Sequence, residues 1–304
     1  MGECSIFNAK KSNTLNDLGV MTFITLSHDF VTTFSALEIY SAFYTKDSAG
    51  NHHFSIRSFI MSTSPSLVNL VDESHKKEFV VYISPYDSTR PYLRSLVVGD
   101  SRLWNSSGYG WEDLSIDEVS VISWRGGRVN DLASRALERA SSGYWFSIKL
   151  CFGVNDILDG RPPHDIFNSL KALKDKILTV CPDTLIAFSE IYPVDLDKAR
   201  QTGRTQTIEQ GHAMKNISSL NELIHSENRR IASYFDFFPA TPCFTNFTMK
   251  CVTRGKKKLR VVRKACLYDG IHGTSAVKCK VVKAVMTAIE LDAANFRASC
   301  YWSA

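Results

Sequence analysis

The chain has 304 residues, of which 44% are hydrophobic and 22% charged, and its formal net charge is +5. This composition is that of an ordinary globular protein with a sizeable core, and the length fits one catalytic-size domain plus an extension. No run of about 18 apolar residues predicts a membrane span, and the N-terminal segment lacks the pattern of a secretory signal. We therefore expect neither a secreted nor a membrane-spanning protein.

The eight cysteines form no CxxC pair and no Cys/His spacing typical of a zinc site. Some of them lie in apolar runs, where a free cysteine behaves as a small buried hydrophobe. We expect no metal, no cofactor and no disulfide framework. The simplest compartment for such a chain is a reducing one, so the prediction is an intracellular, cytoplasmic protein.

The first 90 residues are rich in β-branched and aromatic residues with Ser/Thr-rich connections. We predict strands at 30–44, 54–62 and 79–84, and a turn at 51–53. Residues 1–90 therefore form either a small β-rich domain or an extension packed on a sheet. Residues 91–304 form the second, catalytic-size unit.

From about residue 90 onward, short β-rich runs alternate with amphipathic stretches, which is typical of βαβ units and a parallel sheet. The predicted strands are 93–98, 119–124, 145–152 and 184–188. Apolar residues at helical spacing predict one helix around 166–178, which Pro182 ends, and another at 274–292. The polar segment 194–211 contains two glycines and shows little periodicity, so we expect a loop or a mobile insertion there.

Three of the predicted strands lead directly into blocks that carry chemically useful groups. Gly99-Asp100-Ser101 follows the first, 125–127 (Arg-Gly-Gly) the second, and 153–156 (Gly-Val-Asn-Asp) the third. The carboxyl ends of parallel strands are where open α/β sheets bind ligands. Taken alone, each block is also explained by a turn or a helix cap.

A fourth block, Asp269-Gly270-Ile271-His272, comes just before the last predicted helix. A spacing of three lets the carboxylate accept from one imidazole nitrogen while the other nitrogen faces a hydroxyl. Serine, asparagine amide, aspartate and histidine are the residue types that acyl transfer needs. The four blocks together predict one hydrolase site.

Over about residues 93–289 the chain resembles the SGNH hydrolases, also called the GDSL lipase/esterase superfamily, since the four blocks match in order. The resemblance implies a flavodoxin-like three-layer α/β/α sandwich around a central parallel sheet. It also implies Ser101 as nucleophile, His272 as general base and then acid, and Asp269 as the residue that orients it. The implied oxyanion hole consists of the backbone N–H groups of Ser101 and Gly126 (or Gly127) and the side chain of Asn155.

The chain departs from the family pattern at two places. Arg102 stands where a leucine often follows the serine, and the glycine block is looser than usual. The subfamily is therefore open; similar SGNH domains occur in retroelement proteins and in the Oskar-like family. Trp104 and Gly127, with Arg102, are candidates for a substrate pocket.

We expect an esterase that forms an acyl-enzyme on a small-molecule, carbohydrate or lipid ester, with acetyl or another short acyl group. The alternative is an SGNH scaffold that binds RNA or a protein partner through the basic run 254–264, with Lys256, Lys257 and Lys258 as anion contacts. Such binding domains tend to lose the catalytic residues, which this chain keeps, so nucleic acid is not favoured. A lipid-surface esterase would combine the site with the basic run. The solvated face of a strand or hairpin explains that run better.

Overall fold

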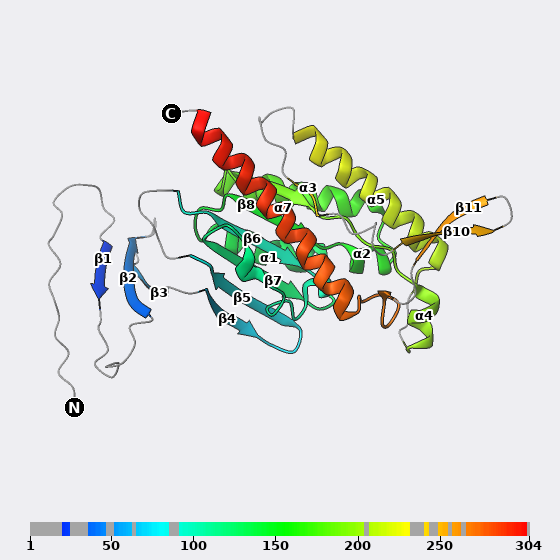
Figure 1. Cartoon of the computed structure of the whole chain (residues 1–304), viewed down its shortest axis with the longest axis horizontal. Helices are drawn as coiled ribbons and strands as arrows, with labels where there is room; N and C mark the ends of the chain where they lie inside the picture. Colours follow the sequence, from blue (N-terminus) through cyan, green and yellow to red (C-terminus); the bar gives the residue numbers. More distant parts are fainter. Residues whose placement is uncertain are drawn as a thin grey trace.

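The computed structural model describes residues 20–24, 36–46, 52–62, 65–84, 91–203, 207–231, 240–242, 249–254, 257–262 and 266–302. These residues form a three-stranded antiparallel sheet, a six-stranded central sheet and a two-stranded hairpin. The three-stranded sheet consists of β1 (Val20–Ile24), β2 (Ala36–Lys46) and β3 (His52–Ser62). Figure 1 shows the central sheet enclosed by helices, with β10 and β11 at the opposite end from β1–β3.

The central sheet has the strand order β4-β5-β7-β6-β8-β9. Its strands are β4 (Ser66–Asp72), β5 (Lys76–Tyr82), β6 (Arg94–Gly99), β7 (Glu118–Trp124), β8 (Ser147–Cys151) and β9 (Leu185–Phe188). Strands β6 to β9 run parallel and lie in the order β7-β6-β8-β9, which is the flavodoxin-like winding. The expected α/β fold is confirmed. The sheet is mixed rather than purely parallel, because β5 pairs antiparallel with β7 and β4 pairs antiparallel with β5.

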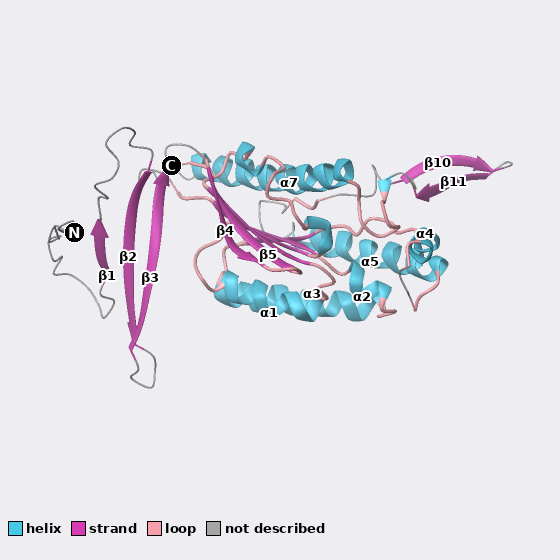
Figure 2. Ribbon diagram, turned by 90° about the horizontal axis from the view of Figure 1, so that it is seen from below, coloured by secondary structure: helices cyan, strands magenta, loops and turns pink. Residues whose placement is uncertain are grey.

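The parallel strands are buried on both faces, as a sheet between two helical layers requires. In β6, Leu96 and Val98 face one hydrophobic core and Val97 faces the other, and all three are fully buried. The first core contains the helices α1 (Val129–Ala140), α3 (Pro163–Val180) and α5 (Gln210–Ile231). The second contains α7 (Ser275–Trp302), and Figure 2 shows these layers on opposite sides of the sheet.

The four predicted strands of the second unit and both predicted helices are present. Helix α3 ends at Val180, just before Pro182, and α7 continues past the predicted end at residue 292. The prediction of a loop or mobile insertion at 194–211 is wrong in part, because α4 (Leu196–Gln201) forms there. The predicted turn at 51–53 is also wrong at His52 and His53, which begin β3, while Asn51 lies outside the described residues.

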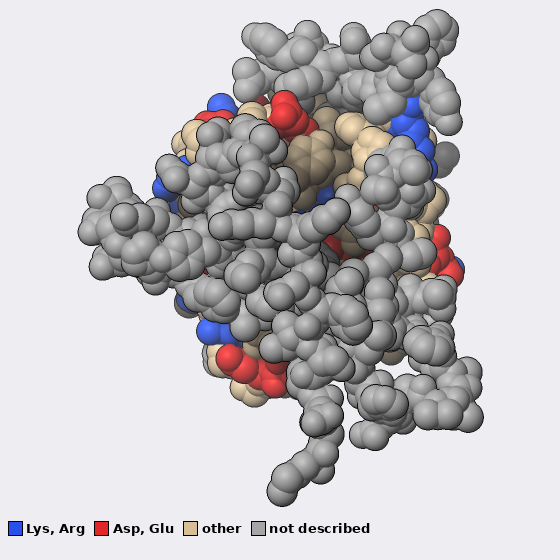
Figure 3. Space-filling view, turned by 90° about the vertical axis from the view of Figure 1, so that its left-hand side faces the viewer, with Lys and Arg blue, Asp and Glu red and all other residues tan. Residues whose placement is uncertain are grey.

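Among the described helices, none is both long and apolar enough to cross a membrane. The described residues also contain no group of three or more His, Cys, Asp or Glu side chains placed to hold a metal ion. Cys151, Cys181, Cys266 and Cys279 are free thiols. On the face seen in Figure 3, the described charged side chains that are visible include both basic and acidic ones.

Candidate active site

The register of the parallel strands brings the first three sequence blocks to one edge of the sheet. Gly99, the last residue of β6, lies opposite Ser123 of β7 and Cys151 of β8. Ser101 comes two residues after Gly99, and Asn155 comes four residues after Cys151. The carboxyl ends of three strands therefore carry the serine, the glycine pair and the asparagine side by side.

Ser101 begins a short 3₁₀ helix that turns sharply away from β6. Asp100 caps this turn, since its carboxylate accepts from the backbone N–H of Arg102 at 3.0 Å. Gly99 makes the close packing of the turn feasible: a Cβ at this position would lie 2.4 Å from Leu103 Cδ1. The packing fixes the nucleophile block, and Ser101 itself is 3% exposed.

The serine is the first member of a hydrogen-bonded chain of three side chains. The Ser101 Oγ atom lies 2.9 Å from His272 Nε2, and His272 Nδ1 lies 2.7 Å from Asp269 Oδ2. The other carboxylate oxygen, Asp269 Oδ1, accepts the backbone N–H of Ile271 at 3.1 Å and that of His272 at 2.7 Å. This arrangement has the connectivity of a nucleophile, a base and an orienting acid.

The surroundings of Asp269 keep its carboxyl group ionised. Burial raises the pKa of Asp269, but the hydrogen bonds from the backbone and side chain of His272 and from the backbone of Ile271 outweigh it, so that the pKa is lowered overall. A charged carboxylate at this place favours a proton on His272 Nδ1. The Nε2 atom then presents its lone pair to Ser101.

The loop that carries Asp269 and His272 is closed on itself and rests on α4. Within the loop, the backbone N–H of Tyr268 donates to the His272 carbonyl at 2.9 Å. Gly270 adopts a positive φ of 83°, and a Cβ there would lie 2.1 Å from the carbonyl oxygen of Asp195. Lys198 of α4 donates to the carbonyl of Leu267 at 2.6 Å. The segment expected to be a loop thus supports the loop that carries His272.

The hydrogen bonds around Gly126 and Gly127 distinguish the two glycines. The N–H of Gly127 donates to the Trp124 carbonyl at 3.2 Å, and its carbonyl accepts from Asn155 Nδ2 at 2.9 Å. Gly127 is buried, whereas Gly126 is exposed and has a positive φ of 72°. Gly127 therefore holds the turn together, and Gly126 is the better placed of the two to donate to a ligand.

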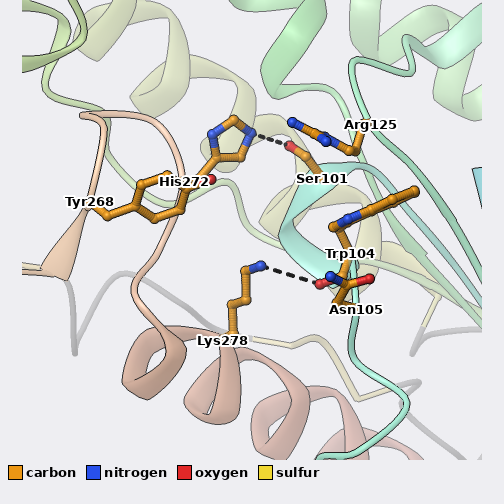
Figure 4. Close-up of a pocket in the computed structure, with 7 residues that line it drawn as sticks. All are labelled: Ser101, Trp104, Asn105, Arg125, Tyr268, His272 and Lys278. Atoms are coloured by element: carbon orange, nitrogen blue, oxygen red, sulfur yellow. Dashed lines mark hydrogen bonds between the residues drawn. The ribbon is translucent and has the colours of Figure 1, made fainter. Parts of the chain in front are cut away.

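A pocket of about 220 Å³ opens beside the serine and the histidine, and Figure 4 shows its side chains. Its lining residues are Ser101, Trp104, Asn105, Arg125, Tyr268, His272 and Lys278. Trp104 lies in the lining; Gly126, Gly127 and Asn155 do not. The ring of Tyr268 stacks on that of His272, with centroids 5.7 Å apart.

The expectation that Arg102 lines a substrate pocket is wrong. Its side chain is 2% exposed, and the guanidinium pairs with Asp100, with Nε at 2.8 Å from Oδ1 and Nη2 at 2.9 Å from Oδ2. A third bond reaches the carbonyl of Glu190 at 3.0 Å. The buried carboxylate of Asp100 needs a paired cation, so Arg102 points into the protein instead of toward the pocket.

Four pocket residues have no role in the predicted site: Asn105, Arg125, Tyr268 and Lys278. Arg125 directly precedes the glycine pair, and Tyr268 directly precedes Asp269. Their position next to a sequence block could therefore have indicated that they line the pocket. Lys278 lies in the first turns of α7, and only the packing of that helix brings it to the pocket.

The described part of the basic run lies on the hairpin of β10 (Met249–Arg254) and β11 (Lys257–Val262). Of the three expected anion contacts, Lys256 lies outside the described residues. Lys257 and Lys258 lie on β11, and the anion-binding role of the three lysines stays a prediction.

Comparison with solved structures found similar proteins, whereas no family model and no curated protein sequence matches the chain. One is a protein from Streptococcus pneumonia provisionally named a platelet activating factor, with 20% identity and a TM-score of 0.47 over 66% of this chain and 86% of that one. A second is a member of the lipolytic protein G-D-S-L family from Veillonella parvula, with 15% identity and a TM-score of 0.44 over 64% and 97%. A third is TesA, with 16% identity and a TM-score of 0.43 over 66% and 99%.

Proposed function

We propose that this chain is a serine hydrolase of the SGNH type that cleaves carboxylic esters through an acyl-enzyme. The observation that carries the proposal is the hydrogen-bonded chain from Ser101 Oγ through His272 to Asp269, with links of 2.9 and 2.7 Å. A serine hydroxyl is a weak nucleophile, and it attacks esters when an adjacent, oriented base takes its proton. The four sequence blocks supply these groups in the family's order.

In the acylation step, Ser101 Oγ bonds to the carbonyl carbon of the ester as its proton passes to His272 Nε2. The carbonyl oxygen becomes an oxyanion, and we assign its stabilisation to the backbone N–H groups of Ser101 and Gly126. Asn155 contributes its second amide hydrogen, because only one of the two is required by Gly127. When the bond to the alcohol oxygen breaks, His272 gives its proton to the departing alcohol.

In the deacylation step, a water molecule attacks the acyl carbon and loses a proton to His272 Nε2. The bond between the acyl carbon and Ser101 Oγ breaks, the hydroxyl recovers its proton and the carboxylic acid leaves. Asp269 remains ionised throughout and stabilises the imidazolium that forms in each half-reaction. The pocket of about 220 Å³ favours a short acyl group such as acetyl, on a small-molecule, carbohydrate or lipid ester.

The test is reaction of the purified chain with a fluorophosphonate probe and with p-nitrophenyl acetate. Wild type should be labelled and active, and Ser101→Ala should lose the label and about 10⁴-fold or more of kcat. The matched control is Ser107→Ala, a nearby serine outside the pocket lining, which should keep both properties. An unlabelled, inactive wild type, or equal labelling of Ser101→Ala, would overturn the proposal.

A further inference from the structure

The pocket beside Ser101 carries two cationic side chains and no acidic one. Arg125 comes from the end of β7 and Lys278 from the N-terminal turns of α7, so two separate elements supply the charges. Figure 4 shows the guanidinium of Arg125 beside Ser101, and Lys278 reaching from α7 toward Trp104. The lining of this pocket is therefore net positive.

Neither cation is neutralised by a carboxylate in the part of the chain that the structure describes. Lys278 Nζ donates to the Trp104 carbonyl at 3.3 Å, and the guanidinium of Arg125 lies 5.6 Å from the centre of the Trp104 ring. Other arginines of the same unit do form ion pairs, namely Arg94, Arg102, Arg128, Arg135 and Arg161. Arg125 thus differs from these five arginines in having no carboxylate partner among the described residues.

The two cations act on each other. Burial lowers the pKa of Lys278, and the positive charge of Arg125 lowers it further. A lysine in the first turns of a helix also meets the positive end of the helix dipole, which is unfavourable. Asp269, the acid whose charge acts on Lys278, is already bonded to His272. The two positive charges in this pocket are thus explained by an anion bound there better than by stability of the fold.

We propose that the site selects anionic esters, in which a carboxylate or similar negative group lies within a few bonds of the scissile carbonyl. This inference rests on the proposed function. The anionic group binds Arg125 and Lys278 by charge-assisted hydrogen bonds while Ser101 attacks the carbonyl. Trp104 and Tyr268 form the apolar walls beside it, and the small volume limits the rest of the ligand.

The experiment compares two pairs of esters in which the neutral member carries a methyl ester where the anionic member carries a carboxylate, and it follows cleavage of the ester that both members share. 3-Acetoxybenzoate and its methyl ester place the charge on the alcohol side; monomethyl and dimethyl succinate place it on the acyl side. For at least one pair, we expect wild type to show a kcat/KM about tenfold higher for the anionic member at low salt. The pair that shows the preference identifies the side that carries the charge.

Arg125→Gln and Lys278→Met should each reduce the ratio of anionic to neutral kcat/KM about five- to tenfold, mainly through KM. The matched control is Lys283→Met, an exposed lysine on the same helix outside the pocket lining, which should keep the wild-type ratio. As a second measurement on wild type alone, raising the salt to about 0.5 M should lower the ratio toward one, because salt screens such attraction.

The outcomes separate this inference from the proposed function. If wild type hydrolyses both members of each pair at similar kcat/KM through Ser101, the charge preference is overturned and the hydrolase stands. A preference that neither substitution nor salt changes also overturns it, since its origin then lies elsewhere. If wild type hydrolyses no ester and Ser101 takes no label, the proposed function fails, and this inference fails with it.

Discussion

Asp269 uses both of its carboxylate oxygens on the loop that carries His272. Oδ2 holds the ring nitrogen, and Oδ1 holds two backbone N–H groups. The same carboxylate therefore shapes the loop and orients the ring. The spacing of three residues between acid and base, visible in the sequence, is what allows both bonds.

Substitution of this acid by its amide should separate the two roles. In Asp269→Asn the amide oxygen can still accept the backbone N–H groups, but the NH₂ group faces His272 Nδ1 and favours the wrong tautomer. We expect kcat to fall by about 10³–10⁴-fold with a modest change in KM. Steady-state kinetics with p-nitrophenyl acetate measures this, with Asp183→Asn, an exposed aspartate, as control. A kcat within tenfold of wild type would contradict the assigned role.

The pH dependence of stability gives an independent check on the same residue. The pKa of Asp269 is lowered in the folded chain. The carboxylate therefore stabilises the fold at pH values above the ordinary aspartate pKa of about 3.9. That contribution is lost as the pH falls through the lowered pKa. The difference in unfolding free energy between wild type and Asp269→Asn should therefore be full at pH 7 and should shrink below about pH 4 in urea titrations. A difference in unfolding free energy that does not change with pH would contradict a lowered pKa of Asp269.

At the scale of elements, the site depends on a short helix that the sequence pattern does not reveal. Six residues are too few for a visible periodicity, and so short a helix has little stability of its own. Helix α4 forms because Val194, Leu196 and Ala199 are fully buried and because Asp195 caps it, its carboxylate accepting from the Lys198 N–H at 3.1 Å. The prediction of a loop failed because polar composition does not report such docking.

The contact between α4 and the reactive loop can be tested at one glycine. In Gly270→Ala, a Cβ would meet the Asp195 carbonyl and the backbone nitrogen of Ala199, at 2.1 and 2.5 Å. Gly160→Ala is the matched control, because its φ of 82° is nearly the same and nothing lies within 4 Å of the new Cβ.

The control Gly160→Ala should lose only about 1–2 kcal/mol of unfolding free energy, because a residue with a Cβ is less stable than glycine at a positive φ. Gly270→Ala should lose about 3–5 kcal/mol and about 10²-fold in kcat, because the loop must shift. Urea denaturation and kinetics measure both effects. Equal losses in the two variants would show that α4 does not support the loop.

For the molecule as a whole, one fully buried ion pair connects the last helix to the middle of the central sheet. Lys149 of β8 pairs with Asp292 of α7, and both side chains are 0% exposed. Asp292 also accepts from Ser147 Oγ at 2.8 Å and from the Ala240 N–H at 2.7 Å. Since α7 follows His272 after two residues, the placement of this helix also bears on the site.

Removal of the lysine should destabilise the whole fold. Lys149→Met leaves the Asp292 carboxylate buried without its cation, and we expect a loss of about 3–5 kcal/mol of unfolding free energy. The double variant Lys149→Met/Asp292→Leu should recover part of the loss, because no unpaired charge remains. Urea denaturation of both variants gives the comparison. A single variant as stable as wild type would rule out this role for the pair.

The sequence by itself determined the parts of this protein that depend on local order. Apolar runs and helical spacing predicted the four parallel strands, α3 and the start of α7. The placement of chemical groups at strand ends predicted which residues would meet, because parallel strands end at the same edge of a sheet.

The tertiary structure alone decided what depends on contacts between distant segments. It turned Arg102 inward, since Asp100 needed a buried partner, and it buried Gly127 in the turn while leaving Gly126 exposed. It also brought Lys278 and Arg125 into the lining of one pocket and docked α4 against the histidine loop. Periodicity and motif spacing contain no information on such long-range packing, because each contact depends on where another element of the fold lies.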